Sequence, residues 1–245
     1  MSSTFETGHA RTLSNFKTLL SFIRLYGNRY TPSKTALQLP NLELTLQRAL
    51  LAMEDLVRKR VVYDNAVNRR QIAFASIKKL ATRLMNGAKI IDLDIRVIND
   101  LQGFNRKIQG QRLTPIPTTS NAVNAITPTY RSASQQSYVQ LTQHWAGFVA
   151  LLENEPKFQP IESEFQITRL TAMRDEMNAA HDALIDAFTD ITNARNLRDE
   201  VLYKQQDNIV DLALQVKKYA KFAYGIDSEE YENIKSLDFR KASRK

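Results

Sequence analysis

The sequence predicts an all-α protein: an elongated antiparallel bundle of two duplicated helical hairpins, with four to five long helices and approximate internal two-fold symmetry. Three observations support this prediction. Gly and Pro number only seven each in 245 residues, and neither occurs in residues 41–86 or 161–224. Few turn signals in a long chain indicate long elements, which are usually helices. Apolar residues recur at alternating spacings of three and four, and the pattern is repeated 128 residues later.

The apolar spacing defines two long helices. From Leu39 to Leu84, twelve of fourteen positions spaced three and four apart are apolar, the exceptions being Arg60 and Arg70. The same frame continues from Ile167 to Tyr219 in the second half of the chain. Such spacing is typical of helices packed as in a coiled coil. We expect Asn-Gly at 86–87 to end the first long helix, and the second to run to Tyr224.

A shorter helix is expected before each long one. Residues 10–26 and 134–153 carry apolar side chains at helical spacing, and an aromatic-x-Pro turn follows each. Proline cannot continue a helix, and it holds the preceding residue extended. The expected organisation is one helical-bundle domain, 1–245, divided into repeat A at 10–86, a return helix at 89–109, a connector at 110–130, repeat B at 134–224 and a tail at 225–245. Within the tail, Asp227-Ser228 followed by acidic residues predicts a short capped helix.

The two long segments align without a gap when the sequence is moved by 128 residues. Leu42 falls on Leu170 and Leu56 on Leu184. The motif Asn-Ala-x-Asn-x-Arg occurs in both, as Asn65, Ala66, Asn68 and Arg70, and as Asn193, Ala194, Asn196 and Arg198. Because the hydrophobic phase is kept as well, we interpret the match as a duplication. The segments around Tyr63 and Ile191 are then expected to lie together.

The repeated motif is the main candidate site. Arg70 and Arg198 fall on the apolar seam, where a charged group is costly unless it is paired. We therefore expect a buried polar layer that fixes the helix register, or alternatively a site for a small anion. Its members are Asn65, Asn68, Arg70, Asn193, Asn196 and Arg198. Amides and guanidinium groups do not titrate near neutral pH, so the motif does not predict catalysis.

Composition limits the remaining chemistry. The chain has no cysteine, which excludes disulfides and thiolate chemistry. His9, His144 and His181 have no partner at a metal-ligand spacing, and the sequence contains no Walker loop, GxGxxG or GxSxG. We expect no catalytic residue, cofactor or metal. No apolar run reaches the roughly 18 residues of a spanning helix, and the first residues lack a secretory-signal pattern. The prediction is a cytoplasmic protein, with export by another route left open.

Charge is divided unevenly along the chain. Residues 1–130 carry 19 Lys and Arg against 8 Asp and Glu, a net +11, and residues 131–245 carry 15 against 18, a net −3. This asymmetry indicates either differently solvated faces or a basic surface that meets an anionic partner or the acidic half of another copy. Nucleic acid is not favoured, because the basic runs at 58–60, 68–70 and 106–112 lack interleaved aromatic residues. A membrane surface is not favoured either, because the bundle needs its apolar faces.

Five segments carry a resemblance to a known family: TFETGHAR, YTPSKTALQLP, NAVNRRQIAF, RKIQGQR and NARNLRDEVLY. The chain resembles an uncharacterised family of all-helical bacterial proteins, found mostly in Bacteroidetes, and the resemblance implies a fold and no activity. More loosely, long helical bundles are similar to the soluble form of α-helical pore-forming toxins, although this chain lacks their long apolar hairpin.

The function predicted from these observations is a non-enzymatic helical scaffold, an assembly or protein-interaction module that associates with itself or with a protein partner. Two alternatives stay open. One is a membrane-active component of the helical-toxin type. The other is a protein that binds a small anion at the Asn/Arg layer.

Overall fold

The computed structural model describes residues 4–111 and 136–240, with side chains from residue 8 onward. This part of the chain is helical and holds no strand, which confirms the all-α class. The α-helices are α1 (Thr4–Tyr26), α2 (Leu39–Phe74), α3 (Ile77–Ile90), α4 (Ile95–Gln109), α5 (Tyr138–Glu153), α6 (Ile167–Asp199), α7 (Ile209–Tyr224) and α8 (Glu229–Lys235). Short 3₁₀ turns are η1 (Gly27–Arg29), η2 (Thr35–Leu37) and η3 (Ser163–Phe165), and η4 (Glu200–Lys204) is a π-helical turn.

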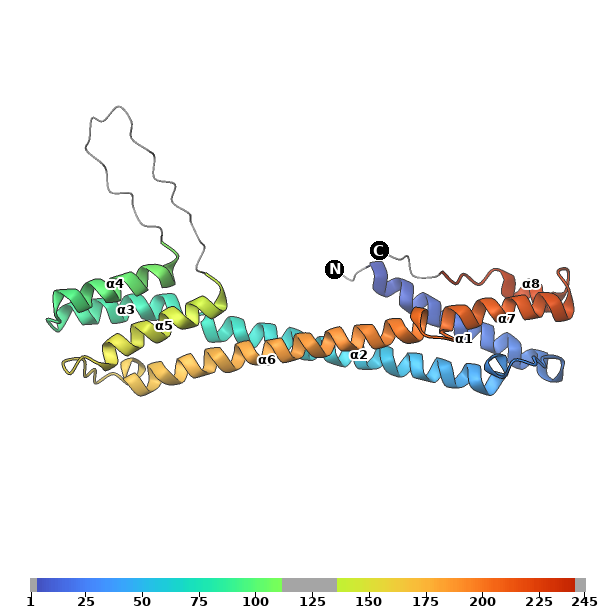
Figure 1. Ribbon diagram of the computed structural model, residues 1–245, viewed down its shortest axis with the longest axis horizontal. Coiled ribbons are helices and arrows are strands. Elements are labelled where there is room, and N and C mark those ends of the chain that lie inside the picture. The colour runs from blue at the N-terminus through green and yellow to red at the C-terminus, as the bar shows by residue number, and fades with distance from the viewer. Residues whose placement is uncertain (1–3, 112–135, 241–245) are drawn as a thin grey trace, which may run out of the picture. The chain divides into compact units, whose positions relative to one another are not determined.

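The helices form two compact units, labelled by helix in Figure 1. Unit 1 comprises residues 1–63 and 187–245, and unit 2 comprises residues 64–186. Helices α2 and α6 are each continuous across a boundary, so each contributes residues to both units.

The core of unit 1 is built around α1, which packs against α7 and α8. Phe16, Leu19 and Leu20 of α1 are fully buried, together with Leu42 of α2 and Val216 of α7. The helical spacing predicted these α1 residues as core. Helix α1 ends before Gly27, whose φ of +54° is a conformation that glycine adopts without strain.

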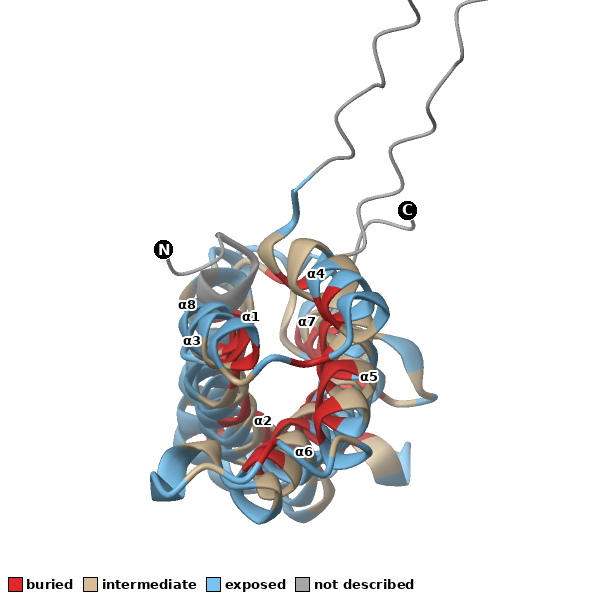
Figure 2. Ribbon diagram, turned by 90° about the vertical axis from the view of Figure 1, so that its left-hand side faces the viewer, coloured by how far each residue is buried: buried red, intermediate tan, exposed pale blue. Residues whose placement is uncertain are grey.

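The core of unit 2 is formed where α4 packs against α3 and α5. Figure 2 shows buried positions on the inward sides of these helices and exposed positions on their outer sides. Trp145 and Phe148 of α5 are fully buried with their rings stacked. The Trp145 indole Nε1 donates a hydrogen bond of 3.1 Å to the carbonyl of Leu170, so its polar atom is satisfied inside the core.

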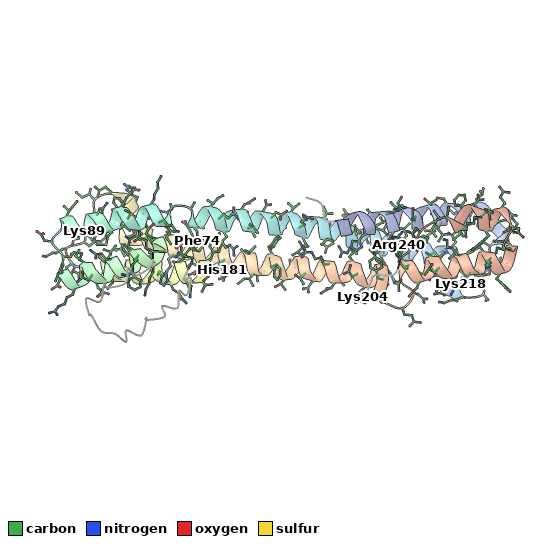
Figure 3. All side chains as sticks on the ribbon, turned by 90° about the horizontal axis from the view of Figure 1, so that it is seen from above. Phe74, Lys89, His181, Lys204, Lys218 and Arg240 are labelled. Carbon is green, nitrogen blue, oxygen red and sulfur yellow. The ribbon has the colours of Figure 1, made fainter. Side chains whose placement is uncertain are left out.

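The predicted end of the first long helix is wrong. Helix α2 ends at Phe74, labelled in Figure 3, and α3 then continues through Asn86 and Gly87 to Ile90. Glycine inside a helix costs only about 1 kcal/mol relative to alanine, so packing on the core can hold it there. The return helix starts later than predicted, at Ile95, where the Asp94 carboxylate accepts a hydrogen bond from the Arg96 amide at 2.8 Å.

The second long helix is also shorter than predicted. It ends at Asp199, the π turn η4 follows, and α7 begins as a separate helix at Ile209. Asn208 caps α7: its side-chain oxygen accepts from the Asp211 amide at 2.9 Å, and its side chain is buried. An asparagine favours a helix start over a helix interior, and this signal was present in the sequence.

The remaining predictions concern the connector and the tail. Most of the connector, residues 112–130, lies outside the described residues. The short helix in the tail is confirmed as α8, with Ser228 as its N-cap accepting from the Tyr231 amide.

Candidate functional site

Within unit 1, α2 meets α6 through a small apolar cluster. Leu56 packs against Ile191 and Ala194, with Tyr63 beside them, and the Tyr63 and Phe188 ring centroids are 6.2 Å apart. The segments around Tyr63 and Ile191 therefore lie together, as the repeat predicted. Ile191 is 1% exposed, so this contact is dry at its centre.

The predicted polar layer is not formed by its asparagines. Asn65, Asn68, Asn193 and Asn196 are all exposed, and their expected place inside the bundle is wrong. The buried members of the repeated motif are instead the alanines, Ala66 at 7% exposure and Ala194 at 3%, together with Arg198. Alanine lets neighbouring helix backbones approach closely, whereas an asparagine at the same place would need buried hydrogen-bond partners.

The two arginines of the motif lie in different units and have different partners. Arg198, in unit 1, is buried, and its Nε and Nη2 donate to Asp199 Oδ1 at 2.9 and 2.7 Å. Arg70, in unit 2, lies with its guanidinium carbon 4.0 Å from the centroid of the Tyr138 ring, a cation–π contact. Because Asp199 already neutralises Arg198, the geometry does not favour an anion there.

Sequence reasoning missed a polar contact at the π turn of unit 1. The Tyr203 hydroxyl of η4 lies 2.7 Å from Nδ1 of His9 on α1. Burial raises the pKa of the Tyr203 hydroxyl, which keeps it neutral and able to share a proton with the imidazole. This contact joins the end of α6 to α1, and neither residue stands in a motif that points to it.

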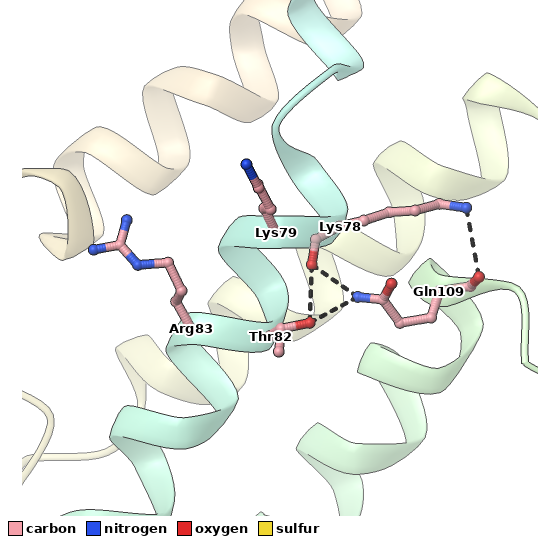
Figure 4. A pocket seen from close by; sticks show the side chains of 5 residues that line it. All are labelled: Lys78, Lys79, Thr82, Arg83 and Gln109. Atoms are coloured by element: carbon pink, nitrogen blue, oxygen red, sulfur yellow. Dashed lines mark hydrogen bonds between the residues drawn. The ribbon is translucent and has the colours of Figure 1, made fainter.

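An open groove in unit 2 gathers cationic residues between α3 and α4. Figure 4 shows its side chains: Lys78 reaches toward Gln109, whereas Lys79 and Arg83 point away from that glutamine. The Gln109 amide donates to the Lys78 carbonyl at 2.8 Å and to the Thr82 hydroxyl at 3.1 Å. Arg83 is engaged by Glu164 at 2.5 and 2.8 Å. The polar groups of the groove thus tie α4 to α3, and its cations do not converge on one point.

The second feature missed at the sequence level is an apolar surface on α2. Six large aliphatic residues of α2 in unit 1 are 37% to 61% exposed. We call them the outer face: Leu44, Leu50, Leu51, Val57, Val61 and Val62. At about 100° per residue they occupy an arc of roughly 140° that excludes the core positions Leu42, Ala49 and Leu56. Spacings of seven and eleven residues could have revealed this arc in the sequence.

Comparisons with known protein families, with curated proteins and with solved structures found no match. The described residues contain no cluster of three or more histidine, aspartate or glutamate side chains placed to hold a metal ion. Of the helices in residues 4–111 and 136–240, none combines the length and apolar character needed to cross a bilayer. The resemblance to a bacterial helical family stays a prediction.

Proposed function

We propose that this protein is a non-enzymatic scaffold that associates with a second copy of itself through the outer face of α2. One observation carries the proposal: α2 already buries one apolar side in the core of unit 1, and its opposite side exposes six more large aliphatic residues, interspersed with polar ones. Large apolar residues on both sides of a helix favour packing on both sides. Exposed apolar patches of this kind mark contacts with other molecules.

The proposal includes duplication of an ancestral helix pair. Element boundaries support it, because η2 begins at Thr35 and η3 at Ser163, while α2 begins at Leu39 and α6 at Ile167, and 163 − 35 and 167 − 39 both equal 128. The elongated two-fold arrangement of the copies stays a prediction of the repeat.

Repeat B offers an internal comparison for the outer face, which lies in repeat A. Core positions are kept between the copies, since Leu42 and Leu170 are both buried, as are Leu56 and Leu184. Five of the six outer-face positions have diverged, and the sixth, Val57, corresponds to Ile185. Their counterparts 128 residues later are Ala172, Asn178, Ala179, Ile185, Thr189 and Asp190. A helix of this type therefore does not need large aliphatic residues there, and their presence on α2 calls for a separate reason.

The size of the outer face sets the expected affinity. Its six side chains together expose about as much as three fully exposed aliphatic side chains, worth about 5–9 kcal/mol per chain if fully buried. A pair of chains would bury part of twice that amount, against an association cost of about 4–15 kcal/mol. Because the two ranges overlap, we expect weak association and take dissociation constants of about 1 μM to 1 mM as the range to test. We expect a reversible, concentration-dependent dimer.

The experiment compares the natural chain with a variant in which five outer-face positions carry the residues found at the matching positions of repeat B. Its substitutions are Leu44→Ala, Leu50→Asn, Leu51→Ala, Val61→Thr and Val62→Asp. Light scattering and sedimentation at protein concentrations from about 1 μM to 1 mM should show a mean mass that rises with concentration for the natural chain only. Leu197→Asn is the matched control, because Leu197 on α6 is 61% exposed, as is Val57. A natural chain that stays monomeric, or a variant that associates equally well, overturns the proposal.

Salt separates this contact from one driven by the charge asymmetry of the chain. Exposed charges are screened beyond about 10 Å at 0.1 M salt and beyond about 3 Å at 1 M. Burial of apolar surface does not depend on those charges. We expect the association to persist at 1 M NaCl, and its loss there would favour a head-to-tail charged contact instead.

One observation favours the membrane-active alternative. Leu25 and Phe222 of unit 1 are 74% and 86% exposed. They precede Tyr26 and Tyr224, whose rings touch where α1 and α7 end. A liposome experiment tests this candidate: dye release that Phe222→Ser abolishes would support it, and no release at any lipid composition would remove it.

A further inference from the structure

We infer that the second copy docks with its α2 antiparallel to the first, an inference that rests on the proposed self-association. The observation is a change in the sign of charge along α2 within unit 1. Residues 41–55 carry three acidic residues and one arginine, a net −2, and residues 56–63 carry three basic residues and no acidic one, a net +3. The acidic residues are Glu43, Glu54 and Asp55, and the basic ones are Arg58, Lys59 and Arg60, with Arg48 as the exception in the first half. Of these, Glu43, Glu54 and Arg58 fall within the arc of the outer face.

This pattern distinguishes the two ways of pairing identical helices. Parallel copies in register would place the acidic half beside the acidic half and the basic half beside the basic half. Antiparallel copies place each half beside the opposite charge. Like charges at a contact are unfavourable and opposite charges fix orientation, even where they add little affinity. A symmetric antiparallel pair also closes on itself, which limits assembly to a dimer.

The apolar side chains favour the same orientation. The acidic half of the outer face carries three leucines, Leu44, Leu50 and Leu51, and the basic half carries three valines, Val57, Val61 and Val62. An antiparallel register that sets Glu54 opposite Arg58 also sets Leu50 opposite Val62 and Leu51 opposite Val61. Facing large and small residues interdigitate better than facing residues of one size.

Several of these charges already have partners within the chain. Arg58 and Asp55 form an exposed pair at 3.1 Å, Lys59 pairs with Asp190 at 2.5 Å, and Glu43 pairs with Arg24 at 2.7 Å. Exposed pairs of this kind contribute little to stability. Glu54 and Arg58 are exposed and lie one turn apart on the outward side of α2, so they are the pair best placed to face a second copy.

The absence of cysteine makes orientation directly measurable. Positions 44 and 62 are separated by 18 residues, or about 27 Å along the helix. We would introduce Leu44→Cys and Val62→Cys in separate chains and treat them with a thiol cross-linker about 10–15 Å long, shorter than that separation. Antiparallel pairing predicts cross-linked dimer in the mixture of the two variants and little in either variant alone. Leu197→Cys on α6 measures the background from random encounters.

The outcomes separate this inference from the proposed function. If light scattering shows no association, the proposed function fails. If the chains associate but Leu44→Cys cross-links efficiently to itself, self-association stands and the antiparallel orientation is overturned. Charge exchange gives a second measurement: Glu54→Arg or Arg58→Glu alone should weaken association by about 2- to 30-fold, and the two together should restore it. Equal effects of the single and double variants would contradict antiparallel pairing.

Discussion

Gly147 on α5 lies close to the Phe104 ring of α4, and a substitution can test this approach. A Cβ atom added there would lie 2.5 Å from Cε1 and from Cζ of Phe104 on α4, well inside van der Waals contact. We therefore expect Gly147→Ala to destabilise unit 2, although alanine is the better helix former. The result depends on how far the Phe104 ring can move, because it is the ring edge that meets the new methyl group.

The magnitude follows from two opposing terms. Replacing glycine by alanine inside a helix gains about 1 kcal/mol, and forcing extra volume into a packed contact costs about 1–3 kcal/mol. Gly87 on α3 and Gly103 on α4 provide matched controls, since an added Cβ meets nothing within 4 Å at either position. Gly147→Ala should therefore be less stable than Gly87→Ala by about 1–3 kcal/mol.

Trp145 makes the measurement specific to unit 2. It is the only tryptophan of the chain and is fully buried one turn or less from the substituted position. Urea titration followed by its fluorescence should give a lower midpoint for Gly147→Ala than for the natural chain, and a higher midpoint for Gly87→Ala. Removing the ring edge in Phe104→Leu/Gly147→Ala should recover part of the loss relative to Phe104→Leu alone. If Gly147→Ala raises the midpoint as much as Gly87→Ala does, the close approach is not rigid and the reasoning is refuted.

Two further predictions address buried polar groups. Burial, and secondarily the charge of Glu230, raises the pKa of Tyr26 to about 12. The pKa of tyrosine in an unfolded chain is near 10. The stabilisation by neutral Tyr26 is therefore complete below about pH 10 and is lost as the pH rises toward 12. Tyr26→Phe should therefore flatten the alkaline fall in unfolding free energy, and an unchanged fall would refute this assignment. Arg198→Met should cost about 1–2 kcal/mol, because it leaves Asp199 without its partner, whereas exposed Arg195→Met should cost under about 0.5 kcal/mol, as measured by urea unfolding. Equal costs would show that the buried pair contributes nothing.

Local features of the fold were predictable because neighbouring residues determine them. The end of α1 before Gly27 and the start of α8 at the Ser228 cap both follow from backbone preferences that act within one turn. The core side of α1 was predictable for a similar reason, since a single apolar stripe specifies which side of a helix is buried.

The pairing of helices was not predictable in the same way. Apolar periodicity shows that a helix has a buried side, but it does not identify the helix that covers it. The predicted hairpins join helices that are neighbours in sequence, whereas α1 packs against α7 and α8 near the other end of the chain. Such contacts depend on non-local packing, which one sequence does not report.

The candidate site was only partly visible in the sequence. The repeated motif drew attention to its asparagines, yet its buried members are Ala66, Ala194 and Arg198, and Arg198 is paired with Asp199. Asparagine is conspicuous in a sequence and alanine is not, although alanine is the residue that a close helix contact requires. The outer face was less visible in the sequence because its aliphatic residues are interspersed with charged and polar ones along α2.

The breaks in the two long helices show how packing can override local preference. Helix α2 ends at Phe74, and the π turn that closes α6 contains Leu202, 128 residues later; both side chains are buried. Neither break contains glycine or proline, whereas Gly87 lies inside a helix. From backbone propensity alone, a break would be expected at Gly87 and continuous helix at Phe74 and Leu202. Each break is followed by a helix that buries an apolar side, α3 against α4 and α7 against α8, so we attribute the breaks to packing rather than to backbone preference.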